Sequence, residues 1–202
     1  MTNRELQLAV QENDDVLDIC RRAAAGDASA QAKLMELLFD HIHTTASYMT
    51  RNAEEAKDVA QMACIAVLQS AGSFRGDSSL RFWADRIVLK VAANVYRKTT
   101  RRKRLWQAYA PPPSARVSTD ENAERGTVRD RLTALLQEMK PQLREVMVLR
   151  HIHGYSMKET AVLCDLPLET ARSRMKKSAE VLRQKVSTDP VLSDWINEWI
   201  AQ

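Results

Sequence analysis

The sequence predicts an all-α protein with two small helical domains joined by a flexible, proline-rich linker, and a short amphipathic helix at the C-terminus. The chain has only 5 Gly and 6 Pro in 202 residues, too few for the many turns of a sandwich or barrel. Apolar residues recur every three or four positions over most of the chain, which is the period of a helix. The triple proline at 111–113 breaks this pattern and divides the chain in two.

The first domain is expected to span residues 15–104, after a flexible N-terminus at 1–14 whose polar residues show no periodicity. Its first helix begins near Asp15 and ends at Gly26, because glycine is favoured just after a helix. Asp27 then suits the N-cap of the second helix. The apolar stripes of these two helices comprise Val16, Ile19, Cys20, Ala23, Ala30, Leu34, Leu37, Leu38, Ile42 and Ala46.

The third helix of this domain has a clear start. Asn52 is a good N-cap residue and Glu55 follows three positions later, as in a capping box. Gly72 and Gly76 then predict a loop at 71–79, and a fourth helix runs from about Ser79 to about residue 103.

Residues 105–126 form the predicted linker, and residues 127–187 the second domain. A helix pattern runs from Val128 to Met139, and Pro141 starts another helix that Gly154 ends. Ser156 can cap a short helix, and after a tight turn around Asp165 a last helix spans 170–186. Two helices joined in this way, with the small Ala161 where they pack closely, indicate a helix-turn-helix.

Residues 188–202 form the predicted C-terminal helix. Trp195, Ile196 and Trp199 lie on one face of this segment, opposite Asp194 and Glu198. Two interpretations stay open: the helix packs onto the second domain, or it binds a regulator or the first domain.

The net charge of +4 conceals an uneven distribution. Residues 97–104 carry six cations and no anion, and residues 172–185 have a net charge of +5, so the rest of the chain sums to −7. Two concentrated basic segments in a mildly acidic protein are typical of nucleic-acid binding.

The last helix is the best DNA-binding candidate, because the second helix of a helix-turn-helix enters the major groove. Arg172, Ser173 and Arg174 lie in its first turns, where base edges are read, and arginine matches guanine in a bidentate way. Lys176 and Lys177 are better placed for phosphates. In the fourth helix, Trp83 ahead of the cations suits stacking on exposed bases, or equally a packed core residue followed by dipole-favoured cations.

No catalytic constellation is found. His41 and His43 are two residues apart, as are His151 and His153, so neither pair shares a helical face, and neither has a cysteine or carboxylate at ligand spacing. The three cysteines are far apart and odd in number, which indicates buried thiols in a reducing cytoplasm. We therefore predict no enzyme activity, no cofactor and no metal. Without a long apolar run or signal peptide, we also predict no membrane insertion.

Several short motifs follow one another along residues 16–187. They comprise Ala56-Lys57-Asp58-Val59-Ala60-Gln61, Phe74-Arg75-Gly76-Asp77-Ser78, Trp83-Ala84-Asp85-Arg86-Ile87, Arg144-Glu145-Val146, Gly154-Tyr155-Ser156 and Thr170-Ala171-Arg172-Ser173-Arg174. In their order and spacing they resemble a bacterial RNA polymerase sigma factor of the extracytoplasmic-function (ECF) group. The resemblance implies that the first domain is sigma domain 2 and the second is sigma domain 4.

The resemblance also implies partners and site residues. Domain 2 would dock on the clamp helices of the largest polymerase subunit through Glu55, Asp58 and Gln61. Its −10 DNA-binding residues would be Phe74, Arg75, Gly76, Asp77, Ser78, Trp83, Arg86, Lys90, Arg97 and Arg101. Domain 4 would contact the polymerase flap region and read the −35 element through Thr170, Arg172, Ser173, Arg174, Lys176 and Lys177.

Factors of this group are usually held inactive by an anti-sigma factor, often at the membrane, so a cytoplasmic protein with such a partner is expected. One alternative is a stand-alone helix-turn-helix regulator, which should dimerise on a palindromic site although no dimer face is evident. A nucleic-acid-modifying enzyme is the third class, and it lacks any acid, base or metal constellation.

Overall fold

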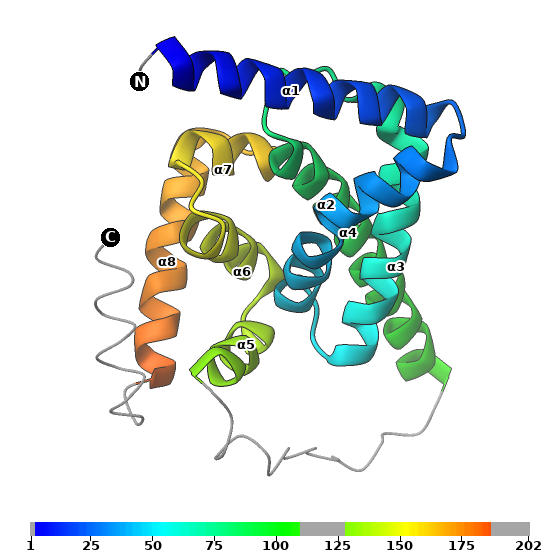
Figure 1. Cartoon of the computed structure of the whole chain (residues 1–202). Coiled ribbons are helices and arrows are strands. Elements are labelled where there is room, and N and C mark those ends of the chain that lie inside the picture. The colour runs from blue at the N-terminus through cyan, green and yellow to red at the C-terminus, as the bar shows by residue number, and fades with distance from the viewer. Residues whose placement is uncertain (1–2, 110–127, 187–202) are drawn as a thin grey trace.

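The computed structural model describes residues 3–109 and 128–186 (Figure 1). Every regular element in these two stretches is a helix, which confirms the predicted all-α fold. Most of the linker expected at 105–126 and the C-terminal helix expected at 188–202 lie outside the described residues.

The first domain contains four long helices: α1 (Asn3–Ala24), α2 (Ala28–Met49), α3 (Ala53–Ser70) and α4 (Leu80–Tyr109), with a 3₁₀ turn, η1 (Ala71–Ser73), after α3. Helix α2 packs against the other three (Figure 1). Its apolar stripe meets those of α3 and α4 in a core whose fully buried members include Leu34, Leu38, Ile42, Val59, Val67 and Val88.

The predicted helix boundaries depend on local chemistry, and several are confirmed. Asp27 accepts hydrogen bonds from the backbone N–H groups of Ser29 and Ala30, and Gly26 has a φ of +91° that favours glycine. Asn52 accepts a hydrogen bond from the N–H of Glu55 at 2.8 Å.

Helix α1 differs from its expected start. It begins at Asn3, whereas the sequence predicted a flexible segment at 1–14. The period of apolar residues reports only a buried face, while backbone helicity also follows intrinsic propensity. The Leu, Glu, Gln and Ala of this segment are good helix formers.

The second domain contains α5 (Val128–Glu138), α6 (Pro141–Met147), a π-helical turn η3 (Val148–Ile152), α7 (Met157–Leu163) and α8 (Leu168–Val186). Ser156 and Glu159 form the capping box at the start of α7. Gly154 has a φ of +75°, and Asp165 adopts +53° in the turn that joins α7 to α8. Helix α8 packs on both α6 and α7, which gives the predicted helix-turn-helix its shape.

The two domains pack against each other. Tyr48, Met49 and Leu89 of the first domain share one apolar core with residues of the second, namely Leu132, Leu136, Met139, Leu143, Met147, Val148 and Leu149. Helices α5 and α6 contact α2, and α7 contacts α4. The sequence had indicated two domains held apart by the linker; in this structure they form one body with a shared interface.

A buried arginine joins the domains at the centre of this interface. Arg144 of α6 is 2% exposed, and its guanidinium donates hydrogen bonds to the carbonyl oxygens of Met49 (2.6 Å) and Thr50 (2.9 Å). Those carbonyls end α2, where a helix leaves acceptors without intrahelical donors. Burial lowers the pKa of Arg144 to about 10, so the group still carries its charge at neutral pH.

Candidate nucleic-acid interface

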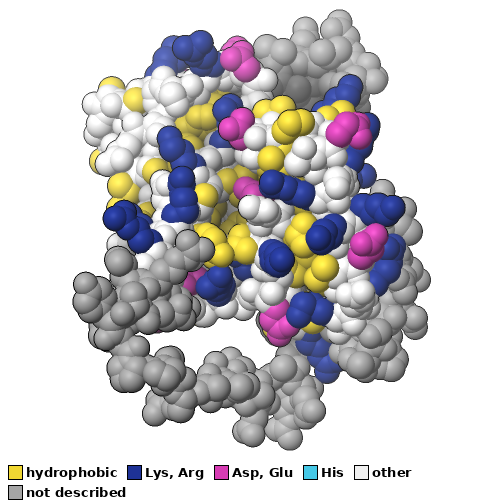
Figure 2. All heavy atoms as spheres, turned by 180° about the vertical axis from the view of Figure 1, so that it is seen from behind, with side chains coloured by type: hydrophobic (Ala, Val, Ile, Leu, Met, Phe, Trp, Pro, Cys, Tyr) yellow, Lys and Arg dark blue, Asp and Glu magenta, His cyan; other side chains and the backbone are white. Residues whose placement is uncertain are grey.

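A stripe of exposed cations runs along one face of α4. Arg86, Lys90, Arg97 and Arg101 are exposed and follow one another at spacings of four, seven and four residues, so they share one side of the helix. Arg97 is oriented by a hydrogen bond to Asn94 Oδ1 at 2.6 Å. Figure 2 shows Lys and Arg side chains spread over the face that lies behind in Figure 1, with acidic groups scattered among them.

The loop before α4 presents polar side chains above an aromatic anchor. Phe74 is 7% exposed, and its ring lies 5.5 Å from that of Trp83, tilted by 59°. Gly76 has a φ of +76°, a conformation that favours glycine, in the turn of this loop. Arg75 and Asp77 are exposed and Ser78 is half-buried. The structure therefore places the polar atoms of this loop at the surface and Phe74 in the core.

A cleft of about 990 Å³ separates α4 from the second domain. Trp83, Arg86, Lys90 and Arg97 line one wall, and the other wall is lined by Glu145, Val162, Leu163, Cys164 and Asp165. Several of the residues predicted to bind the −10 element thus face the second domain across this cleft.

Glu145 of α6 is the more buried of the two carboxyl groups that line this cleft, the other being Asp165. Burial raises its pKa to about 7, against the opposing effects of Arg174 and Arg144. The folded protein therefore holds a proton on Glu145 at pH values where the unfolded chain, with a pKa near 4.5, has lost it. This contribution to stability is complete below about pH 4.5 and is lost as the pH rises through 7.

We expect Glu145→Gln to stabilise the protein at pH 8 by about 2 kcal/mol, after allowance for partial exposure, and to change little at pH 5. The amide keeps the shape of the carboxyl group but has no charge to bury. Urea unfolding of both proteins at pH 5 and pH 8 measures the effect. An equal difference at the two pH values would contradict it.

The recognition helix α8 presents its predicted residues in two groups. Arg172, Ser173, Lys176 and Lys177 are exposed, whereas Thr170 and Arg174 are half-buried. Arg172 makes an ion pair with Glu169 at 2.5 Å, and both groups are exposed, so the pair is worth little and can exchange for a DNA contact. Arg174 is half-buried, and its positive charge opposes the rise in the pKa of Glu145.

Exposed apolar side chains lie beside the acidic side of α3. Asp58 and Gln61 are exposed, while half-buried Glu55 accepts a hydrogen bond from the backbone N–H of Arg51 at 3.3 Å. Met62 and Ile65, 41% and 49% exposed, lie beside them on the same helix. Neither residue was predicted to be functional, although a spacing of four residues from Asp58 and from Gln61 indicates a common face.

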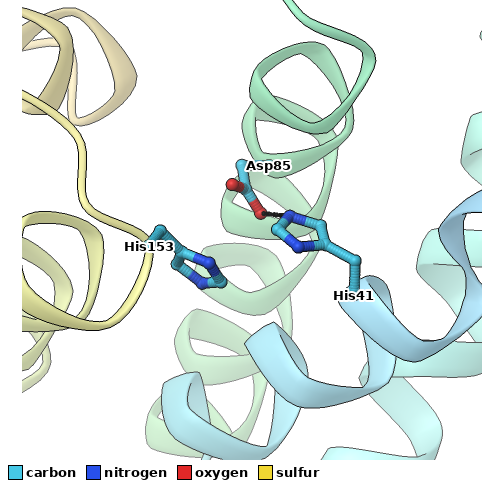
Figure 3. A group of neighbouring side chains, drawn as sticks. All are labelled: His41, Asp85 and His153. Atoms are coloured by element: carbon cyan, nitrogen blue, oxygen red, sulfur yellow. Dashed lines mark hydrogen bonds and ion pairs between the residues drawn. The ribbon is translucent and has the colours of Figure 1, made fainter.

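Three side chains that are far apart in sequence meet where the domains join. His41 of α2, Asp85 of α4 and His153 after η3 lie together (Figure 3). Comparison of neighbouring histidines in the sequence could not reveal this group, because it forms only when the two domains pack. The thiols form no such group: burial raises the pKa of Cys20 to about 11 and also raises the pKa of Cys64 and Cys164.

Comparison with known proteins matches both domains to one family. The family model described as sigma-70 region 2 matches residues 34–102, and that described as sigma-70, region 4 matches residues 129–180. The two regions together cover more than half of the chain, in the order the motifs predicted. The chain belongs to the sigma-70 family. Within the described stretches, no helix has the length and apolarity to cross a membrane.

Full-length relatives place the chain among sigma factors of the ECF type. It is 29% identical to the RNA polymerase sigma-H factor of Pseudomonas aeruginosa, with 87% of this chain and 94% of the relative covered. It is also 29% identical to the ECF RNA polymerase sigma-E factor of Escherichia coli, with 89% and 97% covered. The recognised resemblance is thereby confirmed, and it extends over both domains.

Solved structures share the fold of this sigma factor. CnrH in complex with the cytosolic domain of CnrY is similar with a TM-score of 0.59 and 22% identity, covering 86% of this chain and 97% of that one. The sigma factor RpoE in complex with the anti-sigma factor NepR from Bartonella quintana has a TM-score of 0.59 and 19% identity, covering 78% and 97%.

Proposed function

We propose that this sigma factor binds core RNA polymerase and directs transcription initiation at promoters with specific −10 and −35 elements. The order of the two family regions, each with its own exposed cationic face, carries this proposal. Residues 15–104 would form the polymerase-binding and −10 domain, and residues 127–187 the −35 domain. The protein would supply no catalytic group of its own, and would act in the cytoplasm because polymerase and promoter meet there.

The exposed side of α3 would dock on the clamp helices of the polymerase. Asp58 and Gln61 supply polar contacts, and Met62 and Ile65 supply apolar area that the free protein leaves in water. A small apolar centre with polar groups around it is typical of a protein interface. Glu55, which bonds the backbone at the start of α3, would fix the helix end and contribute its charge.

We expect Asp58→Lys to weaken core binding at least about 10-fold, because a like charge opposite a basic partner surface costs several kcal/mol. Titration of fluorescently labelled protein with core polymerase measures this affinity. Glu36→Lys is the matched control, because it makes the same charge change at an exposed position of α2. It replaces the ion pair of Glu36 with Lys33 by a repulsion between two lysines. Equal losses in the two variants would show a general charge effect instead of docking by α3.

The loop at 74–78 and the cationic stripe of α4 would bind the −10 element as it melts. Extruding a base costs a few kcal/mol, and polar contacts from Arg75, Asp77 and Ser78 would offset that cost. Trp83 would contact the edge of the stacked bases. The cations Arg86, Lys90, Arg97 and Arg101 would bind phosphates. Since Phe74 is buried against Trp83, we assign it the role of positioning the loop.

Run-off transcription with core polymerase on a library of promoters tests the proposal directly. Specific initiation should require both proteins, and the free sigma factor should bind duplex DNA weakly and in a salt-sensitive way. Tight, sequence-specific binding by the free protein, as a dimer on a palindrome, would instead support the stand-alone regulator.

We also propose that an anti-sigma factor controls this protein. The support is indirect: of two proteins of the same fold, the sigma factor RpoE has been solved in complex with the anti-sigma factor NepR, and CnrH in complex with the cytosolic domain of CnrY. A partner that stabilises the packed arrangement of the two domains would keep the −10 residues of α4 facing the second domain. Copurification of the chain with a partner that blocks core binding would identify it.

A further inference from the structure

We propose that His41, Asp85 and His153 form a binding site for a divalent transition-metal ion, of the zinc class, that bridges the two domains. One ligand atom from each residue lies within 4.8 Å of the others. Two of the residues belong to the first domain and one to the second, as Figure 3 shows. Neither the family match nor the sequence analysis provides for a metal here.

The donor set has the right chemistry. Two imidazole nitrogens and one carboxylate oxygen are a known ligand combination for zinc and for ferrous iron, with positions left open for water. In a tetrahedral site with bonds near 2 Å the donors are about 3.3 Å apart. His41 Nε2 and Asp85 Oδ1 are 2.8 Å apart and the three donors lie within 4.8 Å of one another, so a metal requires the first pair to move apart by about 0.5 Å and the widest pair to approach by up to about 1.5 Å.

The surrounding residues hold the ligands in place. Tyr155 donates its hydroxyl hydrogen to Asp85 Oδ2 at 2.6 Å, which leaves Oδ1 directed at His41. The hydroxyl oxygen of Thr45 lies 3.2 Å from Asp85 Oδ1 and 3.1 Å from His153 Nε2. Thr45 therefore links two ligands that come from different domains. Outer partners of this kind fix the orientation of metal ligands.

Burial favours metal over bulk water as the partner of these groups. The Asp85 side chain is 0% exposed and that of His41 only 11%. A buried carboxylate is costly unless a cation or hydrogen bonds compensate it, and a divalent ion would do so strongly.

Because the site needs both domains, an ion bound there would stabilise their packed arrangement. The −10 residues that line the cleft would then stay opposite the second domain. Metal binding itself is independent of the proposed function. The effect of the packed arrangement on the −10 residues in transcription rests on that function.

Co²⁺ is the probe for the first test, because its visible absorption reports the number and type of ligands. We expect the full chain to bind one equivalent, and Zn²⁺ to displace it. His41→Gln, Asp85→Asn and His153→Gln should each lower the affinity by more than the roughly 10- to 100-fold that loss of an outer partner costs. The other two histidines of the chain supply matched controls, His43→Gln and His151→Gln, which should bind as the wild type does.

Unchanged binding in the three ligand variants, or equal loss in the controls, would overturn the site. X-ray absorption of the zinc-loaded wild type adds a test that needs no variant: two imidazoles support the site, and one or none overturns it. In the second test, stoichiometric Zn²⁺ should weaken the binding of single-stranded −10 DNA several-fold in the wild type and not in His153→Gln, because the residues that would bind this DNA line the cleft. Metal binding without that difference would retain the site and refute its effect on domain packing.

Discussion

Arg172→Ala is expected to reduce transcription from a cognate promoter about 10- to 100-fold while core binding stays intact. The side chain is exposed in the second turn of the recognition helix, and its ion pair with Glu169 does not compete strongly. A bidentate contact from arginine to guanine contributes about 1–3 kcal/mol to discrimination. The variant should therefore also lose its preference at one position of the −35 element, which transcription from a set of single-base promoter variants would reveal.

Lys177→Ala provides the contrast within the same helix. Since we propose that exposed Lys177 contacts phosphate, its loss should weaken binding uniformly across promoter sequences. The slope of log K against log salt concentration should fall by about one. Lys185→Ala removes the same charge near the end of α8, where Lys185 pairs with Glu138, and should leave promoter choice unchanged. If Arg172→Ala behaved like Lys177→Ala, Arg172 would be a phosphate contact.

The features that the sequence predicted correctly depend on contacts between residues close together in the chain. Asn52 and Ser156 cap helices through backbone groups three residues away, so their patterns are complete within a few positions. The exposed cations of α4 and α8 were found in the same way, because helical spacing fixes which side chains share a face. The family motifs added the roles of the two faces.

What the sequence missed depends on contacts between distant segments. Arg144 belongs to a short motif that indicated only the second domain, yet its guanidinium bonds carbonyls at the end of α2. His41 and His153 were compared with their sequence neighbours, whereas their partners are each other and Asp85. Such groups follow from how two domains pack, and no local pattern encodes the relative placement of the domains.

Arg144→Met is expected to separate the two domains. Methionine keeps most of the apolar volume but donates nothing, so the carbonyl oxygens of Met49 and Thr50 would be buried without a donor or exposed by opening. Hydrogen bonds from a charged group contribute about 1.5–3 kcal/mol each. The packed arrangement should therefore lose about 3–5 kcal/mol, which small-angle scattering would detect as an increase in the radius of gyration.

Lys140→Met is the control for this change, because it removes the same charge from an exposed position just before α6. Its radius of gyration should equal that of the wild type. An Arg144→Met protein as compact as the wild type would show that the apolar core around Tyr48, Leu89 and Leu136 suffices to hold the domains.

The same variant tests how packing limits access to DNA. Trp83, Arg86 and Lys90 line a cleft whose other wall is the second domain, so separation should let single-stranded −10 DNA reach them. Free Arg144→Met protein should then bind such an oligonucleotide several-fold more tightly than the wild type, with a steeper salt dependence because more phosphates are contacted. Separated domains with unchanged affinity would mean that the cleft already admits the strand, and that polymerase is needed for another step, the melting of the duplex.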